Sequence, residues 1–315
     1  MSGGDRVTLD RFQGCLLGLA LGDALGAPHE GGLLERALWR LIGRTRQGER
    51  RWTDDTQMSI DLAESLLENE GLDPDDAARR FASSYRWSRG YGPAAAKLLK
   101  RIARGADWRD SNRAVYPEGS FGNGGAMRAP VIGLFYSSRP GELVEAARLS
   151  ASITHAHPLG IEGAVLIATA TASVLRDRAS LDLLQEVTAV CTLTPFRSRL
   201  QLAEGWLKSG TDIPVKDVRR QLGNRISASE SCVTALYCAL RFRDGSFDRM
   251  QQFVASCRGD VDTIGAMAGA VWGAANGITR LPAEGLGKLE QRSRLTELAS
   301  ALYGRVDAEG RSRST

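Results

Sequence analysis

Histidine and cysteine, the side chains that most often bind zinc, are scarce in this sequence of 315 residues. A zinc site built on imidazole would need nearly all three histidines, His29, His155 and His157. The five cysteines are odd in number and show no Cys-x-x-Cys spacing, so we expect neither a zinc ribbon nor a disulfide framework. Most of them stand at apolar helical positions, as buried thiols of a reducing compartment do. We therefore expect a cytoplasmic protein.

Long hydrophobic runs and an excess of one charge are also missing. The longest early apolar run, 15–22, is broken by Asp23 and is too short to span a bilayer. The first residues lack a basic segment followed by an apolar one, so we expect no signal peptide and no membrane association. With 41 basic and 37 acidic residues the formal net charge is only +4, which makes nucleic acid an unlikely main partner.

Helical periodicity recurs along the chain, whereas the alternation typical of strands is nearly absent. Asp73 before Pro74, for example, is typical of an N-cap followed by the first helical residue. The patterns predict helices over 56–67, 93–102, 140–150, 158–175, 180–190, 195–208, 229–240, 247–256 and 289–302. We predict an all-α protein that is a monomer, with one domain over residues 1–315 and an orthogonal bundle of about a dozen helices. The core should cover about 10–304, with frayed ends at 1–8 and 308–315.

Glycine recurs every four residues in two distant segments, at 14, 18, 22 and 26 and again at 265, 269, 273 and 277. Each glycine costs about 1 kcal/mol of helix stability relative to alanine in a helix interior, so its repeated use indicates a compensating gain in packing. A glycine stripe at this spacing lets two helix backbones approach closely. We therefore predict two central buried helices that pack against each other.

Each predicted glycine-rich helix adjoins acidic residues: the first runs to Asp23 and Glu30, and the second begins at Asp260 and Asp262, so packing the two stripes together would bring these carboxylates together. Two acidic strings, Thr53-Asp54-Asp55-Thr56 and Asp260-Val261-Asp262-Thr263, would form a cation site if they also meet in space. Oxygen ligands at this density suit Mg²⁺, Mn²⁺ or Ca²⁺. The alternative is that each string only caps a helix, because Asp and Thr are common N-caps.

A glycine-rich loop, 119–125, stands in the middle of the chain and leads into the apolar run 129–136. Its backbone N–H groups could bind phosphate, although it is neither a Walker A loop nor a Rossmann fingerprint. Phe121 inside the loop could stack on a nucleobase. A plain flexible turn, or a core position for Phe121, is the alternative. His155 and His157 follow, one of which should sit at a helix start and touch a ligand or a backbone group.

These motifs, in this order, resemble those of the ADP-ribosylglycohydrolase family. The similarity covers about residues 10 to 280 in five blocks, at 14–30, 52–58, 122–128, 154–158 and 259–273. The resemblance implies an all-α bundle with two Mg²⁺ or Mn²⁺ ions at its centre. It also implies hydrolysis of the bond that joins ADP-ribose to a protein side chain, to another ADP-ribose or to an acetyl group.

Carried over position by position, the resemblance implies a role for each matching residue. The metal ligands would be Thr53, Asp54, Asp55, Asp260, Asp262 and Thr263. Glu30 would stand beside them as a ligand or acid/base, so Glu30 and Asp262 are the candidate catalytic residues. The substrate would be held by Gly119, Ser120, Gly122, Asn123 and Gly124 around its diphosphate, by Phe121 at the adenine, and by His155.

Within the family, the loop 119–128 and the string 89–92 favour the branch that cleaves serine-linked, poly- and O-acetyl-ADP-ribose. The expected partners are therefore ADP-ribose, ADP-ribosylated protein and O-acetyl-ADP-ribose. Phe121 replaces a tyrosine common in that branch, so the arginine-specific branch is the alternative. An isoprenoid synthase would also use clustered aspartates, but it has no use for the glycine loop. An inactive relative of the family would have no need of an intact ligand set.

Overall fold

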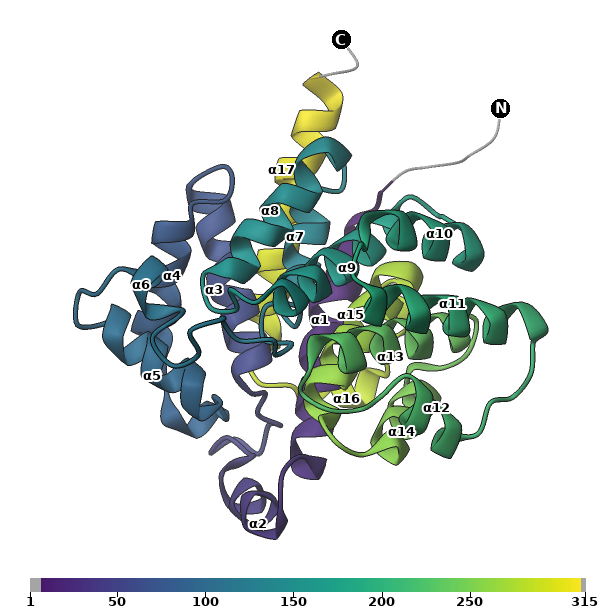
Figure 1. The fold of residues 1–315 in the computed structure, drawn as a ribbon, viewed down its shortest axis with the longest axis horizontal. Helices are drawn as coiled ribbons and strands as arrows, with labels where there is room; N and C mark the ends of the chain where they lie inside the picture. Colours follow the sequence, from purple (N-terminus) through teal and green to yellow (C-terminus); the bar gives the residue numbers. More distant parts are fainter. Residues whose placement is uncertain (1–6, 313–315) are drawn as a thin grey trace.

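Two glycine-rich helices, α1 (Leu9–Gly26) and α15 (Val261–Asn276), lie side by side at the centre of the fold (Figure 1). The protein is seen here in a computed structural model, which describes residues 7–312 and, within them, all side chains except those of 33, 35, 311 and 312. An ideal Cβ on Gly18 would overlap the carbonyl oxygen of Gly269, and one on Gly265 would lie 2.9 Å from the carbonyl oxygen of Gly22. The predicted packing of the two stripes is confirmed.

The other helices surround this central pair, and residues 7–312 contain no strand. The remaining α-helices are α2 (Leu33–Ile42), α3 (Asp54–Glu68), α4 (Pro74–Ser84), α5 (Pro93–Ile102), α6 (Trp108–Ser111), α7 (Ala129–Phe135), α8 (Pro140–Ser152), α9 (Pro158–Leu175), α10 (Ser180–Val190), α11 (Thr194–Ser209), α12 (Val215–Gln221), α13 (Ala228–Arg241), α14 (Phe247–Cys257), α16 (Ala283–Gly287) and α17 (Arg292–Ser312). The prediction of an all-α fold is confirmed. The described residues form 17 α-helices, of which four have seven residues or fewer, so the prediction of about a dozen missed the short ones.

Proline and aspartate mark several helix starts as predicted. Pro93, Pro140 and Pro158 each begin a helix, and the Asp73 carboxylate accepts hydrogen bonds from the N–H groups of Asp75 and Asp76 at 2.9 Å. The sequence patterns did not predict α2, whose Leu34, Leu38 and Leu41 face solvent instead of a core.

The predicted frayed C-terminal end is wrong for residues 308–312, which continue helix α17. The helix goes on past Leu302 because Val306 is still buried and Glu309 pairs with both Arg139 and Arg305, each at 3.3 Å. Residues 1–6 and 313–315, the rest of the predicted frayed ends apart from 7 and 8, lie outside the described residues.

Helix α9 is long and apolar enough to cross a membrane by length and composition alone. However, 83% of its 18-residue window is buried inside the protein, where it packs against α7, α8, α13 and α15. A central helix of a bundle has this character because other helices cover all of its sides.

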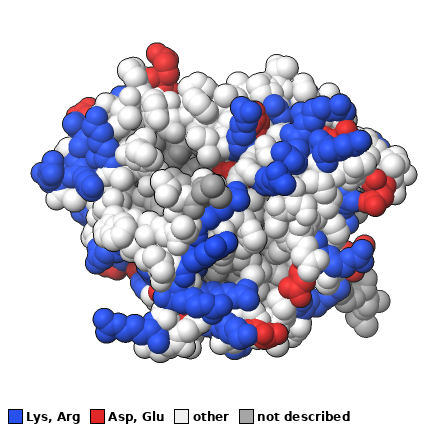
Figure 2. Space-filling view, turned by 90° about the horizontal axis from the view of Figure 1, so that it is seen from below, with Lys and Arg blue, Asp and Glu red and all other residues white. Residues whose placement is uncertain are grey.

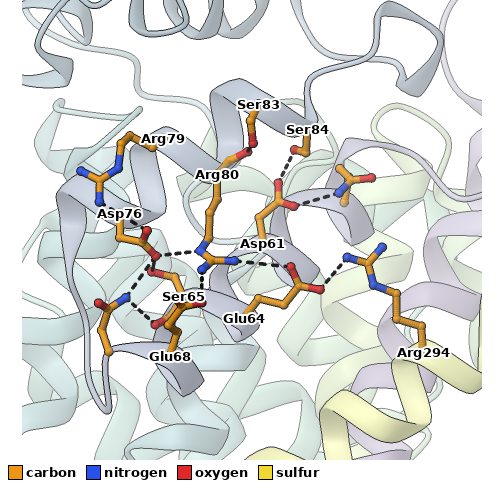
Figure 3. A network of polar contacts seen from close by, with 12 residues as sticks. Asp61, Glu64, Ser65, Glu68, Asp76, Arg79, Arg80, Ser83, Ser84 and Arg294 are labelled. Atoms are coloured by element: carbon orange, nitrogen blue, oxygen red, sulfur yellow. Dashed lines mark hydrogen bonds and ion pairs between the residues drawn. The ribbon is translucent and has the colours of Figure 1, made fainter.

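Helix α3, which begins with the first acidic string, is fastened to its neighbours by a network of charges (Figure 3). Arg80 of α4 contacts Asp76 at 2.7 Å and Glu68 at 2.6 Å, and Arg294 of α17 contacts Glu64 at 2.5 Å. Glu64 and Glu68 lie in the last turns of α3, whereas Asp54 and Asp55 lie in its first turn. The network therefore orients α3 without entering the cavity described next.

Candidate functional site

The first acidic string forms the N-terminus of α3. Thr53 is the N-cap: its Oγ1 accepts a hydrogen bond from the N–H of Asp55 at 3.4 Å and donates one to Asp55 Oδ2 at 2.9 Å. The alternative that the first string only caps a helix is therefore correct for Thr53. The carboxylates of Asp54 and Asp55 do not cap the helix but line a cavity of about 280 Å³.

The second acidic string reaches the same cavity through a sharp turn between α14 and α15. Arg258 and Gly259 both have positive φ, of 55° and 78°, and the N–H of Asp260 donates to the carbonyl oxygen of Asn224 at 2.9 Å. An ideal Cβ on Gly259 would overlap that same carbonyl oxygen, so glycine is required there. The turn brings Asp260 and the first residues of α15 to the cavity wall.

The structure thus brings together carboxylates that are far apart in the sequence. Glu30, Asp54, Asp55, Asp260 and Asp262 all line the one cavity. Glu30, Asp260 and Asp262 each offer an oxygen, and these three oxygens lie within 4.8 Å of one another. Thr263 lines the cavity as well. Such a set offers several oxygen ligands to one or two cations.

The electrostatics of the cluster call for a positive partner. Burial, reinforced by the charges of Asp23 and Glu30, raises the pKa of Asp54 well above its usual value. Burial, Asp23 and Asp54 do the same to the pKa of Asp55, and burial with Glu30 raises the pKa of Asp260 to about 6. Buried Asp55 Oδ1 has no hydrogen-bond partner among the described residues. A divalent cation fits this donor set, because it would bind such an oxygen and offset the repulsion.

Asp23, in α1, was expected near the other carboxylates, but the sequence reasoning gave it no role in the site. It is fully buried, and its Oδ2 accepts hydrogen bonds from the Thr56 hydroxyl at 2.6 Å and the Thr56 N–H at 3.1 Å. Burial raises its pKa to about 6 despite these bonds. A signal was present, since Asp23 is the one charged residue between Gly14 and Gly26.

The glycine loop forms another wall of the cavity, but not all of its residues reach it. Ser120, Gly122, Asn123 and Gly124 line the cavity, whereas Gly119, at φ +83°, is not part of the wall and packs on the backbone of residues 156–157. The prediction that Gly119 contacts a ligand therefore gains no support.

Asn123 connects the loop to the acidic cluster. Its Nδ2 donates to Asp260 Oδ2 and, at 3.0 Å, to Ser231 Oγ, while its N–H donates to the Ile226 carbonyl oxygen at 2.9 Å. The Gly122 N–H donates to Ser120 Oγ at 3.3 Å. Two of the N–H groups expected to bind phosphate are therefore already used inside the protein.

Phe121 lies at the outer edge of the loop. Its side chain is 49% exposed and its ring is 6.1 Å from that of His157, in an edge-on arrangement. The core-packing alternative is wrong, because a core side chain would be buried. Phe121 is not part of the cavity wall, which instead includes the partly exposed Tyr116 and Ile226. Stacking of Phe121 on adenine stays a prediction.

His155 is connected to the buried Arg128 through Thr154. Arg128 Nη2 donates to Thr154 Oγ1 at 3.0 Å, and that hydroxyl shares a hydrogen bond with His155 Nδ1, 2.7 Å away. Burial, and secondarily Arg128, lowers the pKa of His155 to about 3. His157 takes the helix-start role, since its Nδ1 accepts from the Leu159 N–H at 3.1 Å.

Fold and site together define an all-α protein with a buried acidic cavity beside a glycine-rich loop. The sequence model of the ADP-ribosylglycohydrolase family matches residues 5–312, so the chain belongs to this family. It is therefore a hydrolase that acts on ADP-ribosyl bonds. The isoprenoid synthase alternative is excluded.

Relatives of several kinds support this assignment. The chain is 35% identical to human ADP-ribosylhydrolase ARH3, over 87% of this chain and 88% of the relative. It is 33% identical to an uncharacterised protein of Archaeoglobus fulgidus, over 93% and 96%. A solved structure described as an ADP-ribosylglycohydrolase-related protein complex superposes with a TM-score of 0.72 at 29% identity, covering 94% of this chain and 98% of that one.

Proposed function

We propose that this protein releases ADP-ribose from O-linked substrates with the help of two divalent cations, Mg²⁺ or Mn²⁺. The substrates would be serine-linked, poly- and O-acetyl-ADP-ribose. The observation that carries the proposal is the convergence of five carboxylates on one cavity, with the buried Asp55 Oδ1 unpartnered. Oxygen ligands without histidine are the set that hard cations such as Mg²⁺ and Mn²⁺ prefer.

The cations would be held by Thr53, Asp54, Asp55, Asp260, Asp262 and Thr263. When bound, they would supply positive charge that orients the hydroxyl groups of the distal ribose. Glu30 belongs to the same group of oxygens, so it would either complete the ligand set or stand beside it as an acid or base.

The protein's own side chains would then act on the bond between the anomeric carbon and the departing oxygen. As that bond breaks, positive charge develops on the ribose, and the surrounding carboxylates stabilise it. Glu30 or Asp262, in its protonated form, would give a proton to the departing oxygen as the bond breaks, and the resulting carboxylate would take a proton from the attacking water, which restores the carboxyl group. His155, which also lines the cavity, would contact the bound nucleotide.

The O-linked branch rests on residues 89–92 and 119–128 and on the similarity to the ARH3 proteins. Gly90 and Gly92 line the cavity together with the loop, so both strings would adjoin a substrate bound there. Cleavage of arginine-linked ADP-ribose remains the alternative outcome of the experiment below.

The test is a comparison of four substrates, in Mg²⁺ and in EDTA, by the amount of ADP-ribose released. We expect release from serine-linked, poly- and O-acetyl-ADP-ribose, little from arginine-linked ADP-ribose, and none in EDTA. Preferential release from the arginine substrate would move the protein to the other branch. Full activity in EDTA would reject the cation-dependent mechanism.

We also propose that the protein works as a monomer in the cytoplasm. All five cysteines are buried free thiols, which agrees with a reducing compartment. Size-exclusion chromatography with light scattering tests the oligomeric state, and localisation of the tagged protein in cells tests the compartment.

A further inference from the structure

Positive charge is concentrated in two segments of the chain. Residues 31–51 contain six arginines against two glutamates, and residues 86–104 contain six basic residues and no acidic one. Together they carry a net charge of +10, although the whole chain carries only +4. The rest of the protein is therefore net negative, and the basic character belongs to these segments.

Most of these basic side chains are exposed, and they form a group that we call the basic rim. Its members are Arg36, Arg40, Arg44, Arg46, Arg86, Lys97, Lys100, Arg101 and Arg104. None of the nine forms an ion pair with a carboxylate whose side chain the structure describes. Figure 2, which views the molecule from the end where α2 lies, shows Lys and Arg side chains in a band across this face. Unpaired surface cations of this number attract polyanions.

The basic rim borders the cavity at its acidic end. The first segment starts directly after Glu30 and ends directly before Trp52 and Thr53. The second segment supplies Gly90 and, from α5, residues 93–95 to the cavity wall. Arg51 ties the two segments together, since its guanidinium donates to the Ile42 carbonyl oxygen at 2.8 Å and to Ser88 Oγ at 3.4 Å.

An exposed aromatic side chain stands within the rim. Trp87, next to Arg86, is 70% exposed. Nucleotide chains bind to surfaces that combine cations for the phosphates with aromatic faces for the bases. The rim therefore offers both kinds of contact immediately outside the cavity.

We propose that the basic rim binds the ADP-ribose unit that follows the one held in the cavity, so that chains of ADP-ribose are bound through more than one unit. The proposal rests on the proposed function, which places the distal ribose and the bond to be cleaved at the acidic end. The group attached through that bond would therefore lie near Glu30, which lines the cavity and directly precedes the first basic segment. In a polymer the attached group is another ADP-ribose unit, which brings two phosphates and an adenine.

The experiment compares binding and hydrolysis. End-labelled poly(ADP-ribose) is titrated with the protein in EDTA, by fluorescence anisotropy, and KM and kcat are measured in Mg²⁺ for the polymer and for a serine-linked mono-ADP-ribosyl peptide. The variants are Arg36→Gln with Arg40→Gln, and Trp87→Ala. The control is Arg178→Gln with Arg197→Gln, which removes the same charge just before α10 and on α11, two helices that lie far from α2 (Figure 1).

We expect each rim variant to weaken polymer binding and raise the polymer KM by roughly fivefold or more at low salt, with the mono-ADP-ribosyl substrate unchanged. The control should behave like the wild type. Equal effects on both substrates, or no effect on the polymer, would overturn the proposal. So would equal competition by single-stranded DNA with the same number of phosphates, which would indicate a nucleic-acid surface.

The hydrolysis assay tests the proposed function independently of the binding assay. If the wild type hydrolysed neither substrate, the proposed function would be rejected. The binding titration in EDTA needs no turnover, so it would still decide whether the rim binds the polymer.

Discussion

Both carboxylate oxygens of Asp23 accept a hydrogen bond from the backbone N–H of Thr53, at 2.9 and 3.0 Å. Asp23 belongs to α1 and Thr53 is the N-cap of α3, so the bonds join the central helix to the start of the helix that carries Asp54 and Asp55. Asp23 is thereby a positioning residue: it fixes where two candidate metal ligands stand.

The Asp23→Asn variant should therefore be less stable and bind Mg²⁺ more weakly. The amide retains the size of the carboxylate but has only one acceptor oxygen. With that oxygen in the position of Oδ2, the NH2 group takes the position of Oδ1 and faces the N–H of Thr53 in place of an acceptor. We expect a loss of about 1–3 kcal/mol in the free energy of unfolding. Urea unfolding and a calorimetric Mg²⁺ titration measure the two effects. Wild-type Mg²⁺ affinity in a destabilised variant would show that Asp23 serves stability alone.

The candidate metal ligands can be tested by removing single carboxylates. Asp55→Ala and Asp262→Ala should abolish turnover and weaken Mg²⁺ binding, because each removes a charged oxygen. Mg²⁺ should raise the melting temperature of the wild type, since it offsets the repulsion of the clustered carboxylates. Asp248→Ala, at an exposed position on α14, is the control. Retained turnover in both cavity variants would refute these ligand assignments.

Glu30→Gln separates bond breaking from binding. The substitution is nearly isosteric but removes a charge and a proton acceptor. If Glu30 handles a proton, kcat should fall by about 100-fold or more while the Kd for ADP-ribose changes little. Turnover assays and calorimetry with ADP-ribose measure the two quantities. Parallel losses would assign Glu30 to the metal or to the structure instead.

Phe121→Ala tests the stacking prediction. Because the ring is half exposed, its removal should change the free energy of unfolding by less than about 1 kcal/mol. Stacking on adenine would make the loss in ADP-ribose binding about 1–3 kcal/mol, and Phe121→Tyr should be tolerated. Unchanged affinity for ADP-ribose in Phe121→Ala would indicate that the adenine contacts Tyr116 or Ile226 instead, since both line the cavity.

Asp61 should make stability depend on pH. This buried carboxylate on α3 accepts from Ser84 Oγ (Figure 3) and from Gln57 Nε2, and burial raises its pKa to about 7 despite both bonds. The folded state therefore holds the proton more tightly than the unfolded state, whose pKa is near 4. The stability that this group contributes is complete below about pH 4 and is lost as pH rises through about 7.

The Asp61→Asn variant should remove that loss, since an amide does not titrate and can still bond to both neighbours. We expect the wild type to lose about 1–4 kcal/mol more than the variant between pH 5 and pH 8. Urea unfolding at intervals of one pH unit measures the difference. Parallel pH profiles for the two proteins would show that Asp61 has an ordinary pKa.

The sequence predicted those parts of the fold that depend on local chemistry. The starts at Pro93, Pro140 and Pro158 were placed to the residue, whereas the helix predicted from 195 begins one residue earlier, at Thr194. The glycine stripes predicted the central contact because backbone approach needs no knowledge of the rest of the fold. Helix α2 was missed, since its exposed Leu34 and Leu41 do not follow the rule that leucine faces the core. The end of α17 was missed because its last turns are held by ion pairs with distant residues.

In the candidate site too, the residues in recognisable sequence strings were predicted and those that act through tertiary contacts were not. Residues that repeat a recognisable string, such as Asp54, Asp55, Asp260 and Asp262, were found and do converge. Asp23 and Arg128 were not assigned roles, because each acts through a hydrogen bond to another residue, and such bonds are visible only once the chain is folded. The separation of Phe121 from the cavity wall likewise depends on the course of a loop, which composition does not determine.

The contact between α1 and α15 also limits how this sequence can change over evolutionary time. A leucine in the core can be exchanged for a neighbour in size, and later substitutions can restore the fit step by step. The contact of Gly18 with Gly269 has no such intermediate, because even a methyl group would overlap backbone, which cannot adopt another rotamer. Descendants of this chain must therefore keep the pair unaltered or move α1 away from α15, which carries the second acidic string. Because Asp23 of α1 also holds the start of α3, the same contact makes the distance between the two acidic strings one of the least variable quantities of the molecule.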